Sequence, residues 1–319
     1  MIGQSKMARV VAPGLLLVLL TALISGVSNF VNFWAVQGTS SDAFIAVRNA
    51  AVAVILVPLA LLAGFQVRER LTKRQWTQLA TIGLVGGAVP FIFFFRGLQM
   101  AGSAGAGTAT FGYRTLFLMA AVFAIVFLKE RVSRRLACAT VLLLAGNALL
   151  LSLAAPVWSD GTAYVLVATA LWAGEYTVSK HALRDLGGGT VALGRMGFGG
   201  IFLLAYLGLT GQFGAVAGFS GVQWQWLLIS AVLLTGFVVT WYSGLKTTDL
   251  SLASAVLVLA FPITWLLGLT GGGAAPDPAQ GAGAVAIVLG VALAIGLASL
   301  KGTWVCLLRV VRSRVRGGM

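Results

Sequence analysis

Charged side chains are scarce in this chain of 319 residues. Asp, Glu, Lys and Arg make up 9% of the sequence, whereas an average soluble domain carries about 25%. Hydrophobic residues account for 59%. This composition excludes an ordinary soluble domain and indicates an all-α protein that crosses a membrane several times.

The residues and motifs that carry most enzyme chemistry are also scarce. The chain has one histidine, His181, and two cysteines, Cys138 and Cys306. It contains no H-E-x-x-H, G-x-S-x-G or Walker motif, so no metal centre, nucleophilic triad or ATPase site can be assembled from it. We therefore expect a protein that is not an enzyme and that needs no metal, cofactor or disulfide framework.

Long apolar runs fill most of the sequence instead. Ten stretches have 20 or more residues each, so as helices each is long enough to cross a hydrocarbon core of roughly 30 Å. They cover residues 13–35, 42–65, 76–98, 103–127, 135–155, 161–184, 190–212, 223–245, 250–272 and 281–304. The connections between them are too short for a soluble domain, so the sequence predicts ten transmembrane helices.

The net charge of +14 is concentrated in alternate connections between these stretches. Basic residues cluster in 68–74, 129–135 and 301–316, whereas 156–161 and 270–280 contain no lysine or arginine. By the positive-inside rule, the basic connections and both termini face the cytoplasm. We therefore expect a multi-pass protein of the cytoplasmic (inner) membrane, with its basic tail against anionic headgroups and no nucleic-acid partner.

The chain divides into two similar halves. Arg48 recurs as Arg195 at an offset of 147, and Trp76 recurs as Trp224 at an offset of 148. Such matches are informative because arginine and tryptophan are rare in an apolar sequence. Each half has five stretches, an odd number, so the second half must cross the membrane in the opposite sense. Inverted repeats of this kind are typical of secondary transporters, whose substrate site lies near the midplane between the repeats.

These patterns predict three parts of the chain. Residues 1–157 form the first five-helix repeat, residues 158–304 form the second, inverted repeat, and residues 305–319 form a basic cytoplasmic tail. The expected partners are a small-molecule substrate and the lipid bilayer, and the sequence carries no signal for an oligomeric state.

Three segments resemble a known family. They are "ATALWAGEYTVSKHAL" at 168–183, "ASAVLVLAFPITWLLG" at 253–268 and "TATFGYRTLFLMAAVFAIVFLKERVS" at 108–133. They are similar to segments of EamA-type members of the drug/metabolite transporter superfamily, and most of all to YddG-type exporters of aromatic and other neutral amino acids. The sequence departs from the family pattern at Ile24, where a Trp is usual, at Thr115, where the other half has Pro262, and at Asp277, which replaces a Glu.

Arg114 is the most central charge in the predicted helices. An ionisable side chain at such depth is expensive and normally faces a cavity or a partner. Its planar guanidinium is suited to clamp a substrate carboxylate through two hydrogen bonds. The alternative is an internal ion pair that joins helices, for which Glu175 is the only acid near the same depth.

Three other charges have structural or coupling interpretations. Arg48 and Arg195 occupy equal positions in the two halves, which favours a packing or gating role. Glu175 lies at a depth similar to that of Arg195 on a neighbouring helix, so we predict that the two form an ion pair. In the alternative interpretation, Glu175 exchanges protons and couples transport to a pH gradient.

Polar and aromatic stripes predict a substrate cavity between the halves. We expect the first, third, fourth, sixth, eighth and ninth stretches to line it, and the nearly aliphatic fifth and tenth to be peripheral. Cavity, core and lipid-facing positions all remain open for the aromatic side chains. Besides Arg114, the predicted substrate-binding residues are Asn29, Phe111, Trp172, Tyr176, Trp241 and Tyr242.

The resemblance and the cavity together predict a secondary transporter. It would export small amphipathic metabolites, chiefly aromatic and other neutral amino acids, by alternating access through the central cavity. One alternative is a proton-coupled efflux carrier for cationic drugs that uses Glu175. Another is a membrane enzyme or scaffold that transports nothing and holds lipid in a groove.

Overall fold

The computed structural model describes residues 2–35, 39–62, 71–152, 156–270 and 277–296. Every regular element within these ranges is a helix. Helices suit a bilayer because they satisfy all backbone hydrogen bonds within one segment. Eight helical segments of the described chain are long and apolar enough to cross a membrane. The predicted basic tail, together with Cys306, lies outside the described residues.

The first half contributes six α-helices and one π-helix. In order they are α1 (Ile2–Ala35), α2 (Ser41–Leu62), α3 (Lys73–Gly87), α4 (Val89–Arg114), α5 (Leu116–Phe123), the π-helix η1 (Ala124–Leu128) and α6 (Arg134–Leu150). The second half contains α7 (Asp160–Ala182), α8 (Gly188–Leu209), the short α9 (Gly214–Ala217), α10 (Gly221–Thr247), α11 (Leu250–Leu257), α12 (Ala260–Thr270) and α13 (Pro278–Ile295).

The helix breaks agree only in part with the apolar pattern: Gly102 lies in the predicted connection between the third and fourth stretches, whereas other breaks fall inside predicted stretches. The end of the third stretch and the start of the fourth are joined in α4, which kinks at Gly102, where φ is 59° and ψ is −171°. Glycine adopts such a positive φ without steric cost. The third stretch also breaks at Ala88, just before Pro90, whose ring nitrogen cannot donate to a preceding carbonyl. The ninth stretch divides into α11 and α12.

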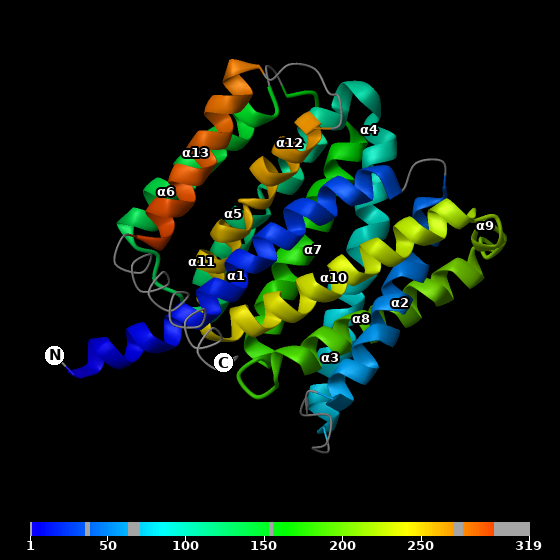
Figure 1. The fold of residues 1–319 in the computed structure, drawn as a ribbon, viewed down its shortest axis with the longest axis horizontal. Coiled ribbons are helices and arrows are strands. Elements are labelled where there is room, and N and C mark those ends of the chain that lie inside the picture. The colour runs from blue at the N-terminus through cyan, green and yellow to red at the C-terminus, as the bar shows by residue number, and fades with distance from the viewer. Residues whose placement is uncertain (1, 36–38, 63–70, 153–155, 271–276, 297–319) are drawn as a thin grey trace, which may run out of the picture.

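Helices of one half pack mainly against helices of the other half. The most extensive pairings are α4 with α7, α1 with α10, α6 with α13, and α2 with α8. In Figure 1, α6 and α13 lie side by side at one edge of the bundle, and α1 runs beside α10 across its face. Small residues allow the closest approach: a Cβ on Gly146 of α6 would lie 2.9 Å from the carbonyl oxygen of Gly283 of α13.

Candidate functional site

A cavity of about 460 Å³ lies between the two halves. A volume of this size is typical of sites for small molecules. Its polar lining residues come from six helices and include three arginines but, among the described residues, no Asp or Glu. They are Ser25, Ser28, Asn29, Asn32, Arg48, Thr110, Tyr113, Arg114, Tyr176, Arg195 and Thr264.

The lining involves more helices than the sequence predicts. Phe44, Ile45 and Arg48 of α2 reach the cavity, as do Arg195 and Met196 of α8. The second and seventh stretches therefore belong to the wall, because α2 and α8 pack against each other at the centre of the bundle. Neither α6 nor α13 contributes to the described lining, as expected for the fifth and tenth stretches.

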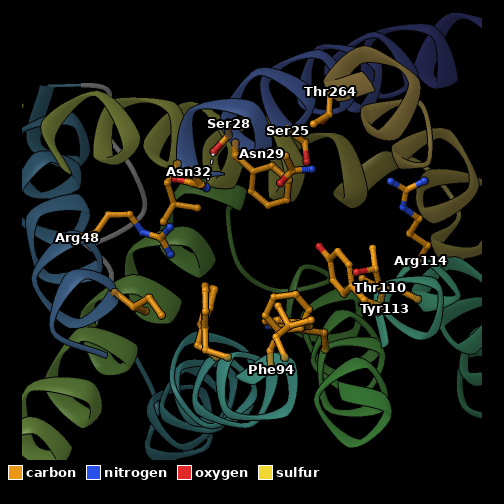
Figure 2. Close-up of a pocket in the computed structure, with 18 of the residues that line it drawn as sticks. Ser25, Ser28, Asn29, Asn32, Arg48, Phe94, Thr110, Tyr113, Arg114 and Thr264 are labelled. Carbon is orange, nitrogen blue, oxygen red and sulfur yellow. Dashed lines mark hydrogen bonds between the residues drawn. The ribbon is translucent and has the colours of Figure 1, made fainter. Parts of the chain in front are cut away.

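One polar face of α1 forms part of the wall. Ser25, Ser28, Asn29 and Asn32 follow the spacing that brings side chains to one side of a helix. The Asn32 amide nitrogen donates to Ser28 Oγ at 3.3 Å, and its oxygen accepts from Ser230 Oγ at 2.5 Å. Figure 2 shows Ser28, Asn29 and Asn32 along this wall, across the cavity from Phe94. Asn29 thus lies where the sequence predicts a substrate contact.

Arg114 lies at one end of the cavity, where α4 ends and Thr115 interrupts the helix before α5 begins. Its guanidinium carbon is 4.5 Å from the centroid of the Phe261 ring. Its Nε and Nη1 atoms are buried, yet within the described chain they have no hydrogen-bond partner. Buried charged groups normally have hydrogen-bond or ion-pair partners, because a buried charge without a partner costs on the order of several kcal/mol. The geometry therefore leaves this end of the cavity suited to an anion.

Arg195 of the cavity wall meets Glu175, which lies behind the wall. Arg195 Nε lies 3.9 Å from Glu175 Oε2, and Arg195 Nη2 donates to the carbonyl oxygen of Gly86 at 3.0 Å. Glu175 Oε1 accepts from Ser179 Oγ at 2.5 Å and from the Tyr242 hydroxyl at 2.7 Å. The structure thus brings together the two residues that the sequence predicts to pair. Glu175 is fully buried and does not line the cavity.

Arg48 lies at the other end of the cavity from Arg114, as Figure 2 shows. Its guanidinium donates to Asn49 Oδ1 from Nε at 3.4 Å and from Nη2 at 3.3 Å. The guanidinium carbon is 5.5 Å from the centroid of the Phe91 ring. Among the described residues Arg48 has no carboxylate within ion-pair distance.

Aromatic rings cover much of the remaining wall. Trp172 and Tyr176 of α7 line the cavity, and Trp172 Nε1 donates to the carbonyl oxygen of Gly86 at 3.1 Å. The Trp172 ring lies 5.5 Å from Phe94 and 5.6 Å from Tyr113, measured between centroids. Sequence reasoning missed Tyr113 and other lining aromatics, although Tyr113 directly precedes Arg114. The others missed are Phe44, Phe91, Phe237 and Phe261.

Three predicted contact residues do not line the cavity. Trp241 and Tyr242 are fully buried behind it, with Trp241 against Tyr176 at 4.7 Å and Tyr242 bonded to Glu175. Phe111 lies on another side of α4. Successive helical residues are turned by about 100°, so Thr110, Tyr113 and Arg114 share the inward face, and Phe111 falls outside it.

A cluster of polar contacts joins the ends of α7, α10 and α11. Glu130 accepts from the backbone nitrogens of Leu250 at 2.7 Å and Ser251 at 3.0 Å, and so caps the start of α11. Lys180 Nζ donates to the carbonyl oxygens of Leu245 at 2.7 Å and Thr248 at 2.8 Å. Lys180 thus ties the end of α7 to the end of α10.

A helical membrane protein with an arginine-rich cavity between two corresponding halves has the architecture of a carrier for small molecules. The chain belongs to the EamA-like transporter family, whose sequence profile matches residues 12–152 and again residues 160–296. Members of this family are membrane transporters rather than enzymes.

A protein of known crystal structure shares the fold. It superposes with a TM-score of 0.73 at 19% sequence identity, over 88% of this chain and 96% of the other. No protein with a curated description matches the sequence.

Proposed function

We propose that this protein is a secondary carrier that exports small amphipathic metabolites bearing a carboxylate, chiefly aromatic and other neutral amino acids. One observation carries the proposal: Arg114 lines an aromatic-walled cavity, and its Nε and Nη1 atoms are buried without a hydrogen-bond partner among the described residues. A substrate carboxylate would supply the missing hydrogen-bond acceptors, and the guanidinium matches it in geometry.

The rest of the wall fits the rest of such a substrate. The ring centroids of Phe94 and Tyr113 lie 5.5 and 5.6 Å from the ring centroid of Trp172. Together the three rings form an apolar surface for a substrate side chain. On the opposite wall, the amide oxygen of Asn29 and the hydroxyls of Ser25 and Ser28 are acceptors for an ammonium group. The cavity thus has one region for each part of an aromatic amino acid.

Alternating access follows from the relation between the halves. In the sequence repeat, α1 corresponds to α7, and the first part of α4 corresponds to α10. The packing of α1 on α10 is then the counterpart of the packing of α7 on α4, and α2 on α8 pairs the two copies of one helix. We infer ten membrane spans in two inverted repeats, with both termini in the cytoplasm. The two repeats would rock against each other about the central cavity.

Efflux of cationic drugs is less well supported. The proton-exchanging group of such a carrier would be Glu175. Its carboxylate lies behind the wall, where it pairs with Arg195 and accepts hydrogen bonds from Ser179 and Tyr242. The cavity itself is lined by three arginines and, among the described residues, by no carboxylate. A cation in this cavity would meet charge of its own sign, which lowers its affinity.

Transport of labelled phenylalanine into or out of proteoliposomes tests the proposal. We expect saturable transport that unlabelled neutral amino acids inhibit and that a panel of organic cations does not. Inhibition or transport of the cations, with no transport of phenylalanine, would support the efflux alternative. Absence of transport for both classes would favour the membrane enzyme or scaffold.

A further inference from the structure

Arg48 and Arg195 occupy equivalent positions in the two halves but have different partners. Arg195 has a carboxylate, Glu175, with Oε2 3.9 Å from its Nε. In the first half, the offsets of 147 and 148 map Glu175 onto Ser28 or Val27, neither of which is charged. The sequence repeat therefore supplies an acid for one arginine and none for the other.

The structure gives Arg48 little in place of that acid. Its hydrogen bonds go to a neutral amide, Asn49 Oδ1, at 3.3 and 3.4 Å, which is at or beyond the long end of the usual range. The rings of Phe91 and Phe44 lie 5.5 and 5.9 Å from the guanidinium carbon. The residue is 5% exposed, and it faces the cavity. A guanidinium so removed from solvent is suited to an anion that enters the cavity.

Among the described residues, the two cavity-lining arginines that have no carboxylate partner, Arg48 and Arg114, lie at the two ends of one cavity. Figure 2 shows Arg48 and Arg114 at opposite ends of it, with Phe94 and Tyr113 between them. The middle of the cavity is thus aromatic and its two ends are cationic. A ligand complementary to this lining has an apolar middle and an acidic group at each end.

We propose that Arg48 is a second anion-binding residue, and that the cavity prefers an amphipathic dianion whose two acidic groups span Arg48 and Arg114. This rests on the proposed function, because the first acidic group takes the position proposed for the substrate carboxylate at Arg114. It narrows the substrate class from neutral amino acids to amphipathic carboxylates that carry a second acidic group. The second group at Arg48 replaces the acid that the first half lacks.

A matched pair of probes tests the second anion site. In 1,4-phenylenediacetate two carboxylates flank one ring, and 4-methylphenylacetate has the same ring with one carboxylate. Binding of each to the purified full-length carrier in detergent is measured by isothermal titration calorimetry at neutral pH. We expect the dianion to bind about ten- to a hundredfold more tightly, the gain typical of a charge-assisted hydrogen bond.

Three variants identify the residue responsible. Arg48→Gln is expected to reduce the advantage of the dianion to less than about twofold. Arg48→Lys, which keeps the charge but loses the planar donor pair, is expected to retain part of it. Arg96→Gln is the control for loss of one positive charge, because Arg96 is exposed, bonds to Tyr206 and lies outside the cavity; its dianion advantage should match that of the unmodified protein.

The outcomes separate this inference from the proposed function. Equal affinity for the two probes, with both dependent on Arg114, would overturn the second site and leave the carboxylate carrier intact. An advantage that persists in a folded Arg48→Gln protein would place the second anion elsewhere and would also overturn the inference. Failure of both probes to bind would contradict the carboxylate site at Arg114, and the second site with it.

Discussion

The carboxylate of Glu175 and the guanidinium of Arg195 meet in the centre of the bundle, with Oε2 and Nε 3.9 Å apart. Glu175 belongs to α7 and Arg195 to α8, so the pair ties two consecutive helices together. Glu175 is completely buried and Arg195 is 5% exposed. In such surroundings each charge depends on the other, because removal of one leaves its partner without compensation.

Glu175→Gln should therefore destabilise the carrier. Breaking a buried pair by removing one partner typically costs about 3–5 kcal/mol, so the midpoint of thermal unfolding in detergent should fall by several degrees. The double variant Glu175→Gln with Arg195→Met should recover part of the loss, because it leaves no unpaired charge. Full stability of Glu175→Gln, with transport that no longer responds to a pH gradient, would instead support proton coupling through Glu175.

Arg114→Ala should abolish carboxylate transport and leave the protein folded. Arg114 has no ion-pair partner in the described chain, so its removal strands no other charge. Loss of the hydrogen bonds to a carboxylate should weaken substrate binding by about ten- to a hundredfold. Phenylalanine transport in proteoliposomes measures the effect, and Arg96→Ala serves as the control.

Two other results for Arg114→Ala would carry a different meaning. Normal transport would show that the carboxylate clamp is wrong. A protein that fails to fold, while Arg96→Ala folds normally, would show that Arg114 holds helices together.

Helix positions and buried charges could be read from the sequence because both follow simple periodic rules. Runs of 20 or more apolar residues predict helices directly. The pairing of Glu175 with Arg195 follows from similar depth on neighbouring helices. The polar face of α1 follows from the spacing of Ser25, Ser28 and Asn29. In each case the position of a residue along its own helix, read as depth or as face, carries the information.

The cavity wall could not be read in the same way, because it depends on how helices pack and break. The break at Ala88 divides the third predicted stretch between α3 and α4, although the apolar run continues through it. Trp241 and Tyr242 are fully buried but do not reach the cavity: Trp241 packs against the lining residue Tyr176, and Tyr242 bonds to Glu175. Periodicity identifies an inward face without telling how many layers of side chains cover it.

Lys129 and Asp160 should be accessible from opposite sides of the membrane. Both residues are exposed, and the basic connection at 129–135 is predicted to be cytoplasmic whereas 156–161 is not. Single cysteines at these positions, in a protein whose Cys138 and Cys306 are replaced by serine, can be labelled with a membrane-impermeant thiol reagent in intact cells. We expect labelling at position 160 only. Labelling of both positions from one side would contradict the ten-span topology.

Asp249 should make stability depend on pH at the junction of α10 and α11. Partial burial and the nearby Glu130 carboxylate raise the pKa of Asp249 above its ordinary value of 3.8. The folded protein therefore binds this proton more tightly than the unfolded chain, so stability falls as pH rises from 3.8 through the raised pKa. Above that window the loss stays constant.

Asp249→Asn should remove this loss. The variant should unfold at a higher temperature than the unmodified protein at pH 7.5, and the difference should shrink at acidic pH. Asp185→Asn, which removes an exposed acid from the connection between α7 and α8, is the control for the loss of one negative charge. An Asp249→Asn protein that is less stable at pH 7.5 would mean that attraction to Lys180 outweighs burial.

Gly86→Ala should disturb the ion pair directly. Gly86 lies in α3, and a Cβ built on it would collide with the side chain of Glu175. The Gly86 carbonyl oxygen also accepts hydrogen bonds from Trp172 Nε1 at 3.1 Å and Arg195 Nη2 at 3.0 Å. Any shift of α3 that relieves the collision lengthens both bonds. Overpacking of this kind costs about 1–3 kcal/mol, which should lower the thermal midpoint.

Gly197→Ala is the matched control for this effect. Gly197 lies in α8, two residues from Arg195, and a Cβ there would have no atom within 4 Å. Its substitution should leave the thermal midpoint unchanged or raise it slightly, because alanine favours the helix. If Gly86→Ala lowers the midpoint, the combination with Glu175→Gln should lower it by less than the sum of the two single changes, since both act on the same contact. Additive losses would show that Gly86 serves the packing of α3 independently of the Glu175 side chain.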